Sequence, residues 1–465
     1  MSGDDRFDHE LRSGLRDLAS EAVPERLVSR VAAIPSSRPD RGRWGSVVRL
    51  ATGLAAAAVL VLAAGVLVLT RPSPGPLVGE SPGASPAPSQ PPIATSAPTA
   101  TPGPSAAPSV APTAAASGPA GGPLPAGLQV FSVTFASPDL GWVLGSAPCA
   151  AAPCTSIART TDGGRTWAGI PAPRTPLAPL GAKAQAEAGS GVSGLRFADP
   201  LDGWAFGPDL WATHDGGSSW HRLSIPGAAS ATVVALEASG GAVQAVLFDQ
   251  AVVRIASSPV ETDGWRLSTV SVPIGAGPVP AAQLVLSGTS GWLMEVDRTV
   301  VGGARLSDGT WSAWTPPCLD LVGPAVLAAS SPTELVAACD VGLWGTPQGE
   351  HLYLSHDGGA SFARTGAPLP ISAAGGVVAT GAGSILVTGA TAQGSALVRS
   401  DDTGQTWQTA LETGTASITY LGFTTPTQGV VLTVAPAGSS GSPGGSLQLT
   451  RDGGLTWRQV SFAGQ

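Results

Sequence analysis

The chain is 465 residues long, has a formal net charge of −8 and contains a single lysine and no asparagine. This length fits several units or one large repetitive domain, and the acidic balance excludes a surface built to neutralise the phosphates of a nucleic acid. The missing asparagine removes N-glycosylation acceptors, and the abundant Ala, Gly and Pro indicate a GC-rich, bacterial genome.

Residues 1-48 form the first predicted unit. Apolar residues from Phe7 to Leu18 recur at spacings of three and four, and Pro24 precedes a second apolar pattern, so the segment is predicted to form two short amphipathic α-helices. Its eight arginines are balanced by eight acidic residues, which excludes a strong polybasic lipid anchor. The tail is either a solvated membrane-proximal segment or a docking helix for a cytoplasmic partner.

Residues 49-71 are predicted to be a transmembrane anchor helix. Leu50 to Thr70 carries no charge over 21 residues, between Arg49 and Arg71, and about 20 apolar residues suffice to span a bilayer. The 48 preceding residues argue against a cleaved signal peptide. Arginines gather on the N-terminal side, so the N-terminus is expected in the cytoplasm and the rest of this single-pass protein of the cell membrane outside.

Residues 72-127 read as a linker. They contain 16 prolines, one charged residue (Glu80) and no aromatic residue, so they cannot bury a core and should form an extended, disordered stalk. The Ser, Thr and Pro content also suits O-glycosylation. We expect this stalk to hold the following domain away from the membrane.

A short motif recurs after Leu128. It first reads TTDGGRTW from Thr160 to Trp167, and four further copies read THDGGSSW, SHDGGASF, SDDTGQTW and TRDGGLTW. Their aspartates are Asp162, Asp215, Asp357, Asp402 and Asp452.

The spacing of these aspartates predicts two decayed copies of the motif. Three of the four steps between these aspartates are close to 50 residues, and the fourth, of 142, is about three times as long. The sequences TDGW and SDGTW supply Asp263 and Asp308 inside this gap. Seven units, each with several short strands, are typical of a β-propeller. We therefore predict an all-β, seven-bladed propeller over residues 128-465.

The motif resembles the Asp-box, or BNR repeat, of sialidases, sortilin-type receptors and Ycf48-type photosystem II assembly factors. The Gly-Trp pairs two strands earlier, such as Gly141-Trp142 and Gly203-Trp204, are most similar to the Ycf48-type repeat. This resemblance covers about three quarters of the chain and implies seven blades, each with its box between the third and fourth strands. For the Ycf48-type it also implies chaperone-like binding of a membrane-protein partner, helped by an arginine patch that this acidic domain does not match.

Each box is predicted to be structural. A short aspartate side chain accepts hydrogen bonds from backbone N–H groups in a hairpin, glycines supply positive φ, and the final aromatic packs against the sheet. Seven copies also argue against one catalytic site, and DGGRTW lacks the alternating oxygen ligands of a calcium loop. The residues assigned to this role are Asp162, Asp215, Asp263, Asp308, Asp357, Asp402, Asp452, Trp167, Trp220, Phe362, Trp407 and Trp457.

A sialidase-like glycoside hydrolase is the alternative function. The resemblance to sialidases implies a Tyr nucleophile, acidic partners and three arginines that hold a carboxylate. Tyr353 and Tyr420 are the two tyrosines, and Tyr353 lies in a predicted strand where sheet packing explains it. Three arginines, Arg159, Arg399 and Arg451, lie beside boxes and are expected to belong to the repeat.

The repeat region contains two kinds of candidate metal ligand, four histidines and four cysteines. His214, His221, His351 and His356 fall in separate turns and strands without metal-ligand spacing. In a four-stranded blade, the first-to-second and third-to-fourth turns share one face, and the other connections share the opposite one. On that opposite face we pair Cys149 with Cys154 and Cys318 with Cys339 as disulfides, in preference to a metal site.

The cysteine-bearing face also receives the longest insertion, residues 171-192. Loops of variable length often carry recognition, so the sequence favours this face for an unknown protein or glycan ligand. The prediction is a membrane-anchored, extracytoplasmic and non-catalytic binding or scaffold module. No cofactor, metal or nucleic acid is expected.

Overall fold

The computed structural model describes the repeat region and the end of the preceding linker. The described residues are 118–150, 154–179, 189–250, 252–275, 281–319, 321, 323, 325–340, 349–380, 383–435 and 445–462. The predicted tail, the predicted membrane helix and the first part of the linker lie outside these ranges. Within the ranges, the structure contains no helix with the length and apolar character needed to cross a bilayer.

The described residues form strands β1 to β28, which pair antiparallel with their sequence neighbours in groups of four. Five groups are separate four-stranded sheets. The other two are joined into one larger sheet by a single pair, Val130 with Gly445, between β1 and β27. We name the seven groups blades 1 to 7 in chain order, and their strands A to D from the innermost to the outermost.

The first four blades are built from consecutive segments. Blade 1 contains β1 (Gln129–Phe135), β2 (Gly141–Ser146), β3 (Thr155–Thr160) and β4 (Ala168–Ile170). Blade 2 contains β5 (Gly194–Phe197), β6 (Gly203–Phe206), β7 (Leu210–Thr213) and β8 (His221–Leu223). Blade 3 contains β9 (Thr232–Ser239), β10 (Ala242–Asp249), β11 (Val252–Pro259) and β12 (Arg266–Pro273). Blade 4 contains β13 (Ala281–Ser287), β14 (Ser290–Asp297), β15 (Thr299–Ser307) and β16 (Thr310–Trp314).

The last three blades follow the same plan. Blade 5 contains β17 (Ala325–Ala329), β18 (Leu335–Asp340), β19 (Glu350–Ser355) and β20 (Ala363–Thr365). Blade 6 contains β21 (Ser372–Ala379), β22 (Ile385–Thr391), β23 (Gly394–Ser400) and β24 (Gln408–Glu412). Blade 7 contains β25 (Ser417–Phe423), β26 (Gly429–Val434), β27 (Gly445–Thr450) and β28 (Arg458–Gln459).

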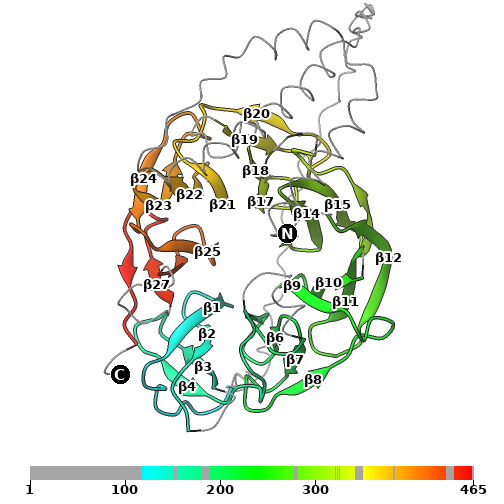
Figure 1. Cartoon of the computed structure of the whole chain (residues 1–465), viewed down its shortest axis with the longest axis vertical. Helices are drawn as coiled ribbons and strands as arrows, with labels where there is room; N and C mark the ends of the chain where they lie inside the picture. Colours follow the sequence, from blue (N-terminus) through cyan, green and yellow to red (C-terminus); the bar gives the residue numbers. More distant parts are fainter. Residues whose placement is uncertain are drawn as a thin grey trace, which may run out of the picture. The chain divides into compact units, whose positions relative to one another are not determined.

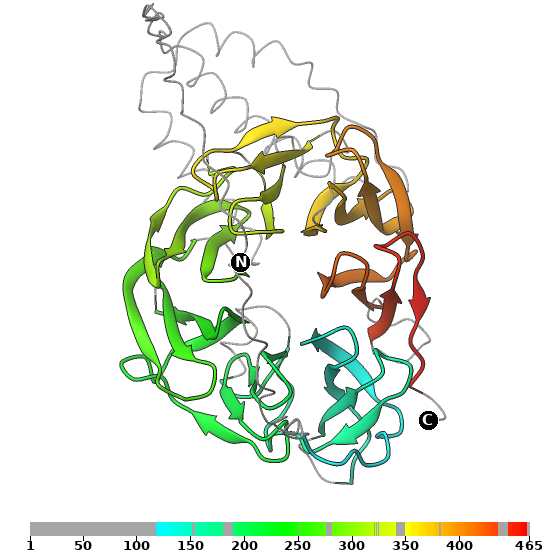
Figure 2. The ribbon, with the colours of Figure 1, turned by 180° about the vertical axis from the view of Figure 1, so that it is seen from behind.

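The seven blades close into a ring. Each A strand contacts the A strand of the next blade, from β1 through β5, β9, β13, β17 and β21 to β25, and β1 contacts β26 and β27 of blade 7. Figure 1 shows the blades arranged around a common axis, and Figure 2 shows the same ring from behind. The predicted all-β, seven-bladed propeller is confirmed.

Packing explains why a Gly-Trp pair opens the B strand of several blades. A Cβ atom at Gly203 would lie 2.5 Å from the ring of Phe197 on the neighbouring A strand. The tryptophan of the pair is buried between blades, because Trp142 of blade 1 stacks on Phe197 of blade 2 with ring centroids 3.9 Å apart. The motif therefore fixes both the interior of one blade and its contact with the next.

Residues 118–127 of the predicted linker lie against blade 1. Gly122 pairs with Gly169 of β4 through two backbone hydrogen bonds of 2.8 and 3.1 Å. Arg159 Nη2 also donates to the Pro119 carbonyl oxygen at 2.6 Å. The described part of the folded domain thus includes the ten residues before the boundary at 128 that composition suggests.

Candidate functional site

Each intact box is closed by a small network of hydrogen bonds. In blade 1, Thr160 Oγ1 donates to Asp162 at 2.8 Å and accepts from the Gly164 N–H at 2.8 Å. The Asp162 carboxylate accepts from the N–H and the hydroxyl of Thr166 at 2.9 and 2.6 Å. The same pattern occurs at Asp215, Asp357, Asp402 and Asp452.

These hydrogen bonds keep the box aspartates ionised. Burial raises the pKa of Asp162, but the hydrogen bonds from Thr166, Thr160 and Arg165 together outweigh it and lower the pKa to about 2. The Thr406 hydroxyl and N–H likewise lower the pKa of Asp402 to about 2. A carboxylate that accepts this many bonds is poorly suited to act as a general acid or as a metal ligand. Its role in the box is to hold the turn.

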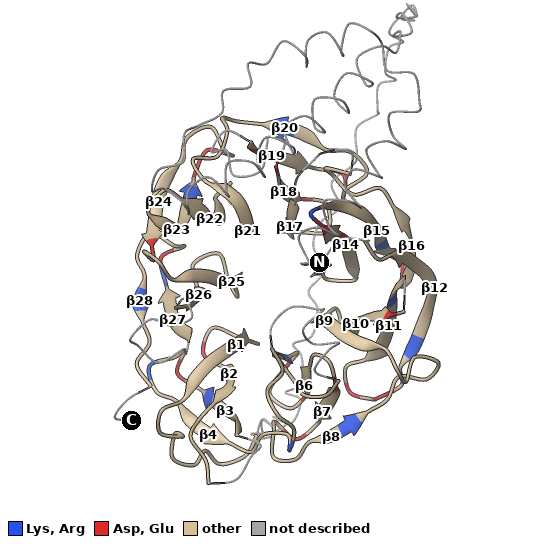
Figure 3. Ribbon diagram, in the orientation of Figure 1, with Lys and Arg blue, Asp and Glu red and all other residues tan. Residues whose placement is uncertain are grey.

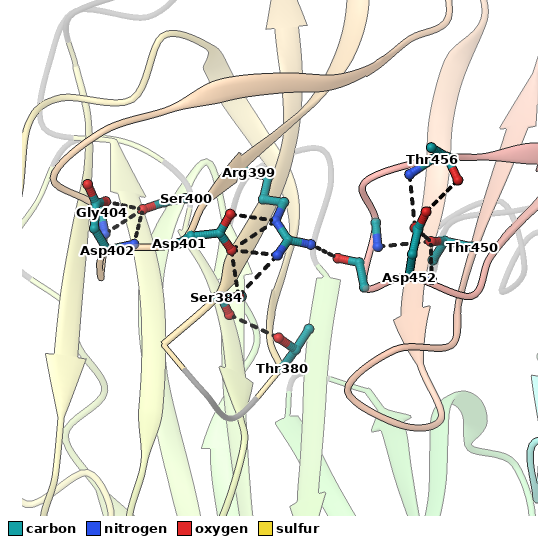
Figure 4. Close-up of polar contacts among 12 residues, drawn as sticks. Thr380, Ser384, Arg399, Ser400, Asp401, Asp402, Gly404, Thr450, Asp452 and Thr456 are labelled. Atoms are coloured by element: carbon teal, nitrogen blue, oxygen red, sulfur yellow. Dashed lines mark hydrogen bonds and ion pairs between the residues drawn. The ribbon is translucent and has the colours of Figure 1, made fainter.

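The boxes also join adjacent blades. The Gly163 carbonyl oxygen in the blade 1 box accepts a hydrogen bond from Arg451 Nη2 of blade 7 at 2.5 Å. In the same way, Arg399 of blade 6 donates to the Gly453 carbonyl oxygen in the blade 7 box, while Asp401 holds the other side of its guanidinium (Figure 4). The arginines beside the boxes therefore bind backbone carbonyls and do not converge on a ligand.

In the blade 5 and blade 2 boxes, indole N–H groups make the contact with the preceding blade. In the blade 5 box, the carbonyls of Gly358 and Gly359 accept hydrogen bonds from Trp292 and Trp314 of blade 4 at 3.0 and 2.8 Å. In the blade 2 box, Trp220 Nε1 donates to the Pro171 carbonyl oxygen of the segment that follows β4 at 3.0 Å. The A–B and C–D turns share one face of the ring, which we call the box face. We call each contact between adjacent blades on this face a seam.

Asp263 and Asp308 lie in the C–D turns of blades 3 and 4, where the spacing placed them, but their carboxylates make other contacts. Asp308 has a φ of 50° and, with Gly309 at 73°, forms a two-residue turn between β15 and β16. Asp263 instead reaches His221 of blade 2, with 2.7 Å between Oδ2 and Nε2. The described contacts of these two turns thus do not reproduce the box network.

Two seams are open where these boxes have decayed. A cavity of about 790 Å³ lies between blades 3 and 4, and one of about 490 Å³ lies between blades 2 and 3. Ser239, Gly240 and Gly241 line both cavities, so the two adjoin at the A–B turn of blade 3. Because an intact box packs onto the preceding blade, its loss in blades 3 and 4 leaves these two seams unfilled. We call the larger cavity the seam groove.

The seam groove is lined by hydroxyl, glycine and apolar side chains. Its lining includes one ionisable side chain, Arg266. Trp311 forms part of its wall and donates from Nε1 to Gln244 at 3.0 Å. The lining residues with hydroxyl groups are Ser239, Ser257, Ser258, Thr262, Ser268, Thr269, Thr289 and Thr310. This composition favours hydrogen bonding to a neutral or extended ligand over acid–base chemistry.

Irregular backbone forms part of the groove wall. Ala256 pairs with Leu267 and Arg254 pairs with Ser271, so residues 268–270 of β12 bulge out of the ladder. β12 is the outermost strand of blade 3 (Figure 1). Polar backbone groups of a bulged outer strand are available to an incoming chain.

A group of polar side chains from three blades meets in the central channel. Arg196 of β5 donates to Glu237 of β9 at 2.6 Å and lies over the ring of Tyr420 on β25, 5.8 Å from its centroid. A cavity of about 470 Å³ is lined by Glu237, Tyr420 and the A strands of blades 4 to 7. Figure 3 shows that charged residues are sparse along the inner strands, which makes this cluster distinctive.

The opposite face carries both predicted disulfides, Cys149–Cys154 and Cys318–Cys339. The first lies in the B–C loop of blade 1, and the second ties the connection into blade 5 to the end of β18. We call this the cysteine face. The seam groove is on the box face, so it lies opposite the face that loop length favoured.

Buried carboxylates fasten the inter-blade connections on the cysteine face. Asp209 accepts from the Gly191 N–H at 3.0 Å, in the connection that enters blade 2. Glu350 of blade 5 accepts from the Ala374 N–H of blade 6 at 2.8 Å. Burial raises the pKa of Glu350 to about 7 and that of Glu295, in the equivalent region of blade 4, to about 8.

Among known proteins, solved structures are what this chain is found to be similar to. No protein-family model and no curated protein matches this chain. Among solved structures, Ycf48 bound to a D1 peptide is 17% identical over 71% of this chain and 95% of its own, with a TM-score of 0.48. Ycf48 from Cyanidioschyzon merolae is 15% identical over 72% and 98%, with a TM-score of 0.47. A GH74 xyloglucanase from Xanthomonas campestris is 14% identical over 72% and 61%, with a TM-score of 0.41.

Ycf48 is thus named both among the solved structures similar to this chain and in the resemblance of its Asp-box and Gly-Trp residues. Sequence reasoning nevertheless missed two groups of side chains. It did not foresee that Arg196, Glu237 and Tyr420 meet, because they come from blades 2, 3 and 7. It also placed His214 in a box turn and His221 apart from it, without metal-ligand spacing, whereas the two lie together with Asp263 across the seam between blades 2 and 3.

Proposed function

We propose that this propeller is a non-catalytic binding module that holds an extended segment of a partner protein in the seam groove. The observation that carries the proposal is the lining of the groove, which offers many hydroxyl groups and a single ionisable side chain, Arg266. Acid–base catalysis needs at least one positioned group that exchanges a proton near neutral pH. An arginine side chain does not supply one, because it stays protonated.

The wall of the groove favours a polypeptide as the occupant. The bulge at residues 268–270 leaves strand backbone outside the ladder, and an extended peptide can pair with such groups by strand addition. Leu267, Leu286 and Trp311 supply apolar surface beside it for alternate side chains. A glycan is the competing occupant, since hydroxyl groups and a tryptophan also suit sugars.

Site-directed photo-crosslinking tests this function. A photoreactive residue placed at Thr269, on the groove wall, should capture a partner protein in the native membrane, and the captured segment should bind the purified chain. The matched control is Thr409, which is also exposed on an outermost strand but lies in blade 6, whose box is intact.

Blocking the groove supplies the second arm of this test. Thr289→Trp fills the groove from an exposed turn and should abolish capture, whereas Gln393→Trp, on an exposed turn of the cysteine face, should leave capture unchanged. If Gln393→Trp abolished capture and Thr289→Trp did not, the binding surface would lie on the cysteine face. Competition by a glycan, and not by the peptide, would identify the other ligand class.

We also propose that the module is displayed outside the cell from a single membrane helix. The support is the uncharged stretch from Leu50 to Thr70 and the arginines that precede it. Protease added to intact cells should cut or shed the propeller, and an intact propeller after this treatment would contradict the orientation. Carbonate extraction should leave the chain in the membrane pellet.

A sialidase-like hydrolase is a second candidate, favoured by the meeting of Tyr420, Glu237 and Arg196 in the channel. The described residues bring one arginine to this point, where the resemblance to sialidases implies three. Purified chain should turn over no glycoside in a panel that includes sialosides. Turnover that Tyr420→Phe abolishes, and Tyr353→Phe does not, would establish the hydrolase instead.

A further inference from the structure

A cluster of metal-ligand side chains crosses the open seam between blades 2 and 3. His214 lies in the blade 2 box, His221 begins β8, and Asp263 lies in the C–D turn of blade 3. One ligand atom from each of the three residues lies within 4.8 Å of the others. We propose that His214, His221 and Asp263 bind a divalent transition-metal ion, with Zn²⁺ as the best fit.

The chemistry of these donors suits zinc. Two imidazole nitrogens and one carboxylate oxygen form a mixed N/O set that Zn²⁺ accepts in tetrahedral geometry. At bond lengths near 2.1 Å, ligand atoms around tetrahedral zinc lie about 3.4 Å apart. His214 Nε2 and Asp263 Oδ2 are 3.4 Å apart, and His221 Nε2 and Asp263 Oδ2 are 2.7 Å apart. The second pair needs to separate by about 0.7 Å, which rotation of the exposed His221 side chain can supply.

A neighbouring carboxylate orients one of the ligands. Asp202 contacts His214 Nδ1, which leaves Nε2 directed toward Asp263. Metal-binding histidines commonly pair their second ring nitrogen with a carboxylate in this way, and the pairing fixes the tautomer and raises ligand basicity. Asp202 is buried, so the orienting group is itself held in place.

The site remains open to solvent and to the adjoining cavity. The side chains of His214 and Asp263 are 29% and 28% exposed, and that of His221 is 50% exposed. Glu261 and Thr262, the residues just before Asp263, line the cavity between blades 2 and 3. Three protein ligands leave one tetrahedral position for water or for a donor atom of a bound ligand.

Blade 5 provides an internal comparison. His356 occupies the same box position as His214, and its Nδ1 contacts Glu334 at 2.6 Å, as His214 contacts Asp202. The residue equivalent to His221 is Ala363, and the next blade has an intact box whose Asp402 is already occupied by Ser400 and Thr406. The histidine–carboxylate pair therefore recurs, whereas the two further ligands are specific to the open seam.

Metal counting on the purified full-length chain tests the proposal. After chelator treatment and equilibration with Zn²⁺, the chain should retain one ion, and Co²⁺ in its place should give visible absorption of a four-coordinate site. His221→Ala and Asp263→Asn should each weaken binding at least tenfold, and Asp202→Asn by about 10- to 100-fold. His356→Ala is the matched control and should bind as the unchanged chain does.

A stability measurement separates loss of binding from loss of folding. Zn²⁺ should raise the thermal midpoint of the unchanged chain, because an ion that binds the folded state stabilises it, and should leave that of Asp263→Asn unchanged. Circular dichroism without metal should be the same for both. Failure of the unchanged chain to retain Zn²⁺, or unaltered retention by both His221→Ala and Asp263→Asn, would overturn the site. Neither result bears on peptide capture at Thr269, so the two proposals fail separately.

Discussion

Two kinds of carboxylate in this protein respond to pH in opposite ways. Glu295 is buried, and its pKa is raised from an ordinary value of 4.5 to about 8. Asp452, in the blade 7 box, has its pKa lowered from 3.8 to about 2 by hydrogen bonds from Thr456 and Thr450 that outweigh burial. Folding stability therefore depends on pH at both ends of the range.

Glu295→Gln should stabilise the propeller at alkaline pH. The folded state keeps a proton on Glu295 that the unfolded state loses above its own lower pKa, so stability contributed by this group falls as pH rises from 4.5 to about 8. The glutamine cannot lose a proton, so the gain in free energy of unfolding should grow across this window. Urea unfolding at several pH values measures it, with Glu412→Gln, at an exposed position of β24, as the control. A gain that is independent of pH would contradict the assignment.

Asp452→Asn should destabilise the propeller at neutral pH and lose its effect in acid. A depressed pKa stabilises the fold above the unfolded value of 3.8, and this stabilisation disappears as pH falls to about 2. The thermal midpoints of variant and unchanged chain should therefore converge as the solution is acidified. Glu412→Gln, on the outermost strand of blade 6, is the control. A constant difference between the midpoints would show that the charge of Asp452 is irrelevant.

At the scale of the element, the box forms a turn and also binds the preceding blade, a contact that we call the clasp. Arg451→Ala removes the bond to the Gly163 carbonyl and loosens the seam between blades 7 and 1. Hydrogen bonds with a charged partner are worth about 1.5 to 3 kcal/mol, so the free energy of unfolding should fall by about that amount. Arg458→Ala, on an exposed position of β28, is the control for loss of charge. Equal effects of the two variants would refute the clasp.

The repeat made most of the fold predictable. The spacing of Asp162 and its copies indicated seven units, and the cysteine pairing followed from which strand ends share a face. The sites were harder to foresee, because each depends on which blades adjoin. Arg196 and Tyr420 are far apart in the chain and meet only when the ring closes. A sequence signal did exist for the open seams, since the degenerate motifs at Asp263 and Asp308 mark the blades that lack a clasp.

At the scale of the whole molecule, the seven seams are unequal. Five are covered by intact boxes, whereas the seams between blades 2 and 3 and between blades 3 and 4 adjoin cavities. Local opening is favoured where buried contacts and satisfied backbone groups are few. The ring should therefore be least rigid at blades 3 and 4.

Hydrogen exchange should show this inequality directly. Amides in the C–D turns of blades 3 and 4 should exchange faster than those of the blade 1 and blade 7 boxes, whose N–H groups are bonded to Asp162 and Asp452. Mass spectrometry of peptic fragments resolves these turns. Equal protection of the amides in all seven C–D turns would contradict the expectation that blades 3 and 4 are the least rigid. Zn²⁺ should slow exchange at the blade 3 turn but not at the blade 4 turn.

The ring closes through a single backbone pair between β1 and β27, which bears on where the chain termini can be placed. Every described blade is built from one contiguous segment, and the contact that closes the ring resembles the one between blades 6 and 7, because in both a box carbonyl accepts a hydrogen bond from an arginine of the preceding blade. No strand needs to be exchanged between the two ends of the repeat region. A circularly permuted chain, with blades 7 and 1 covalently linked and new termini between two other blades, should therefore fold to the same ring.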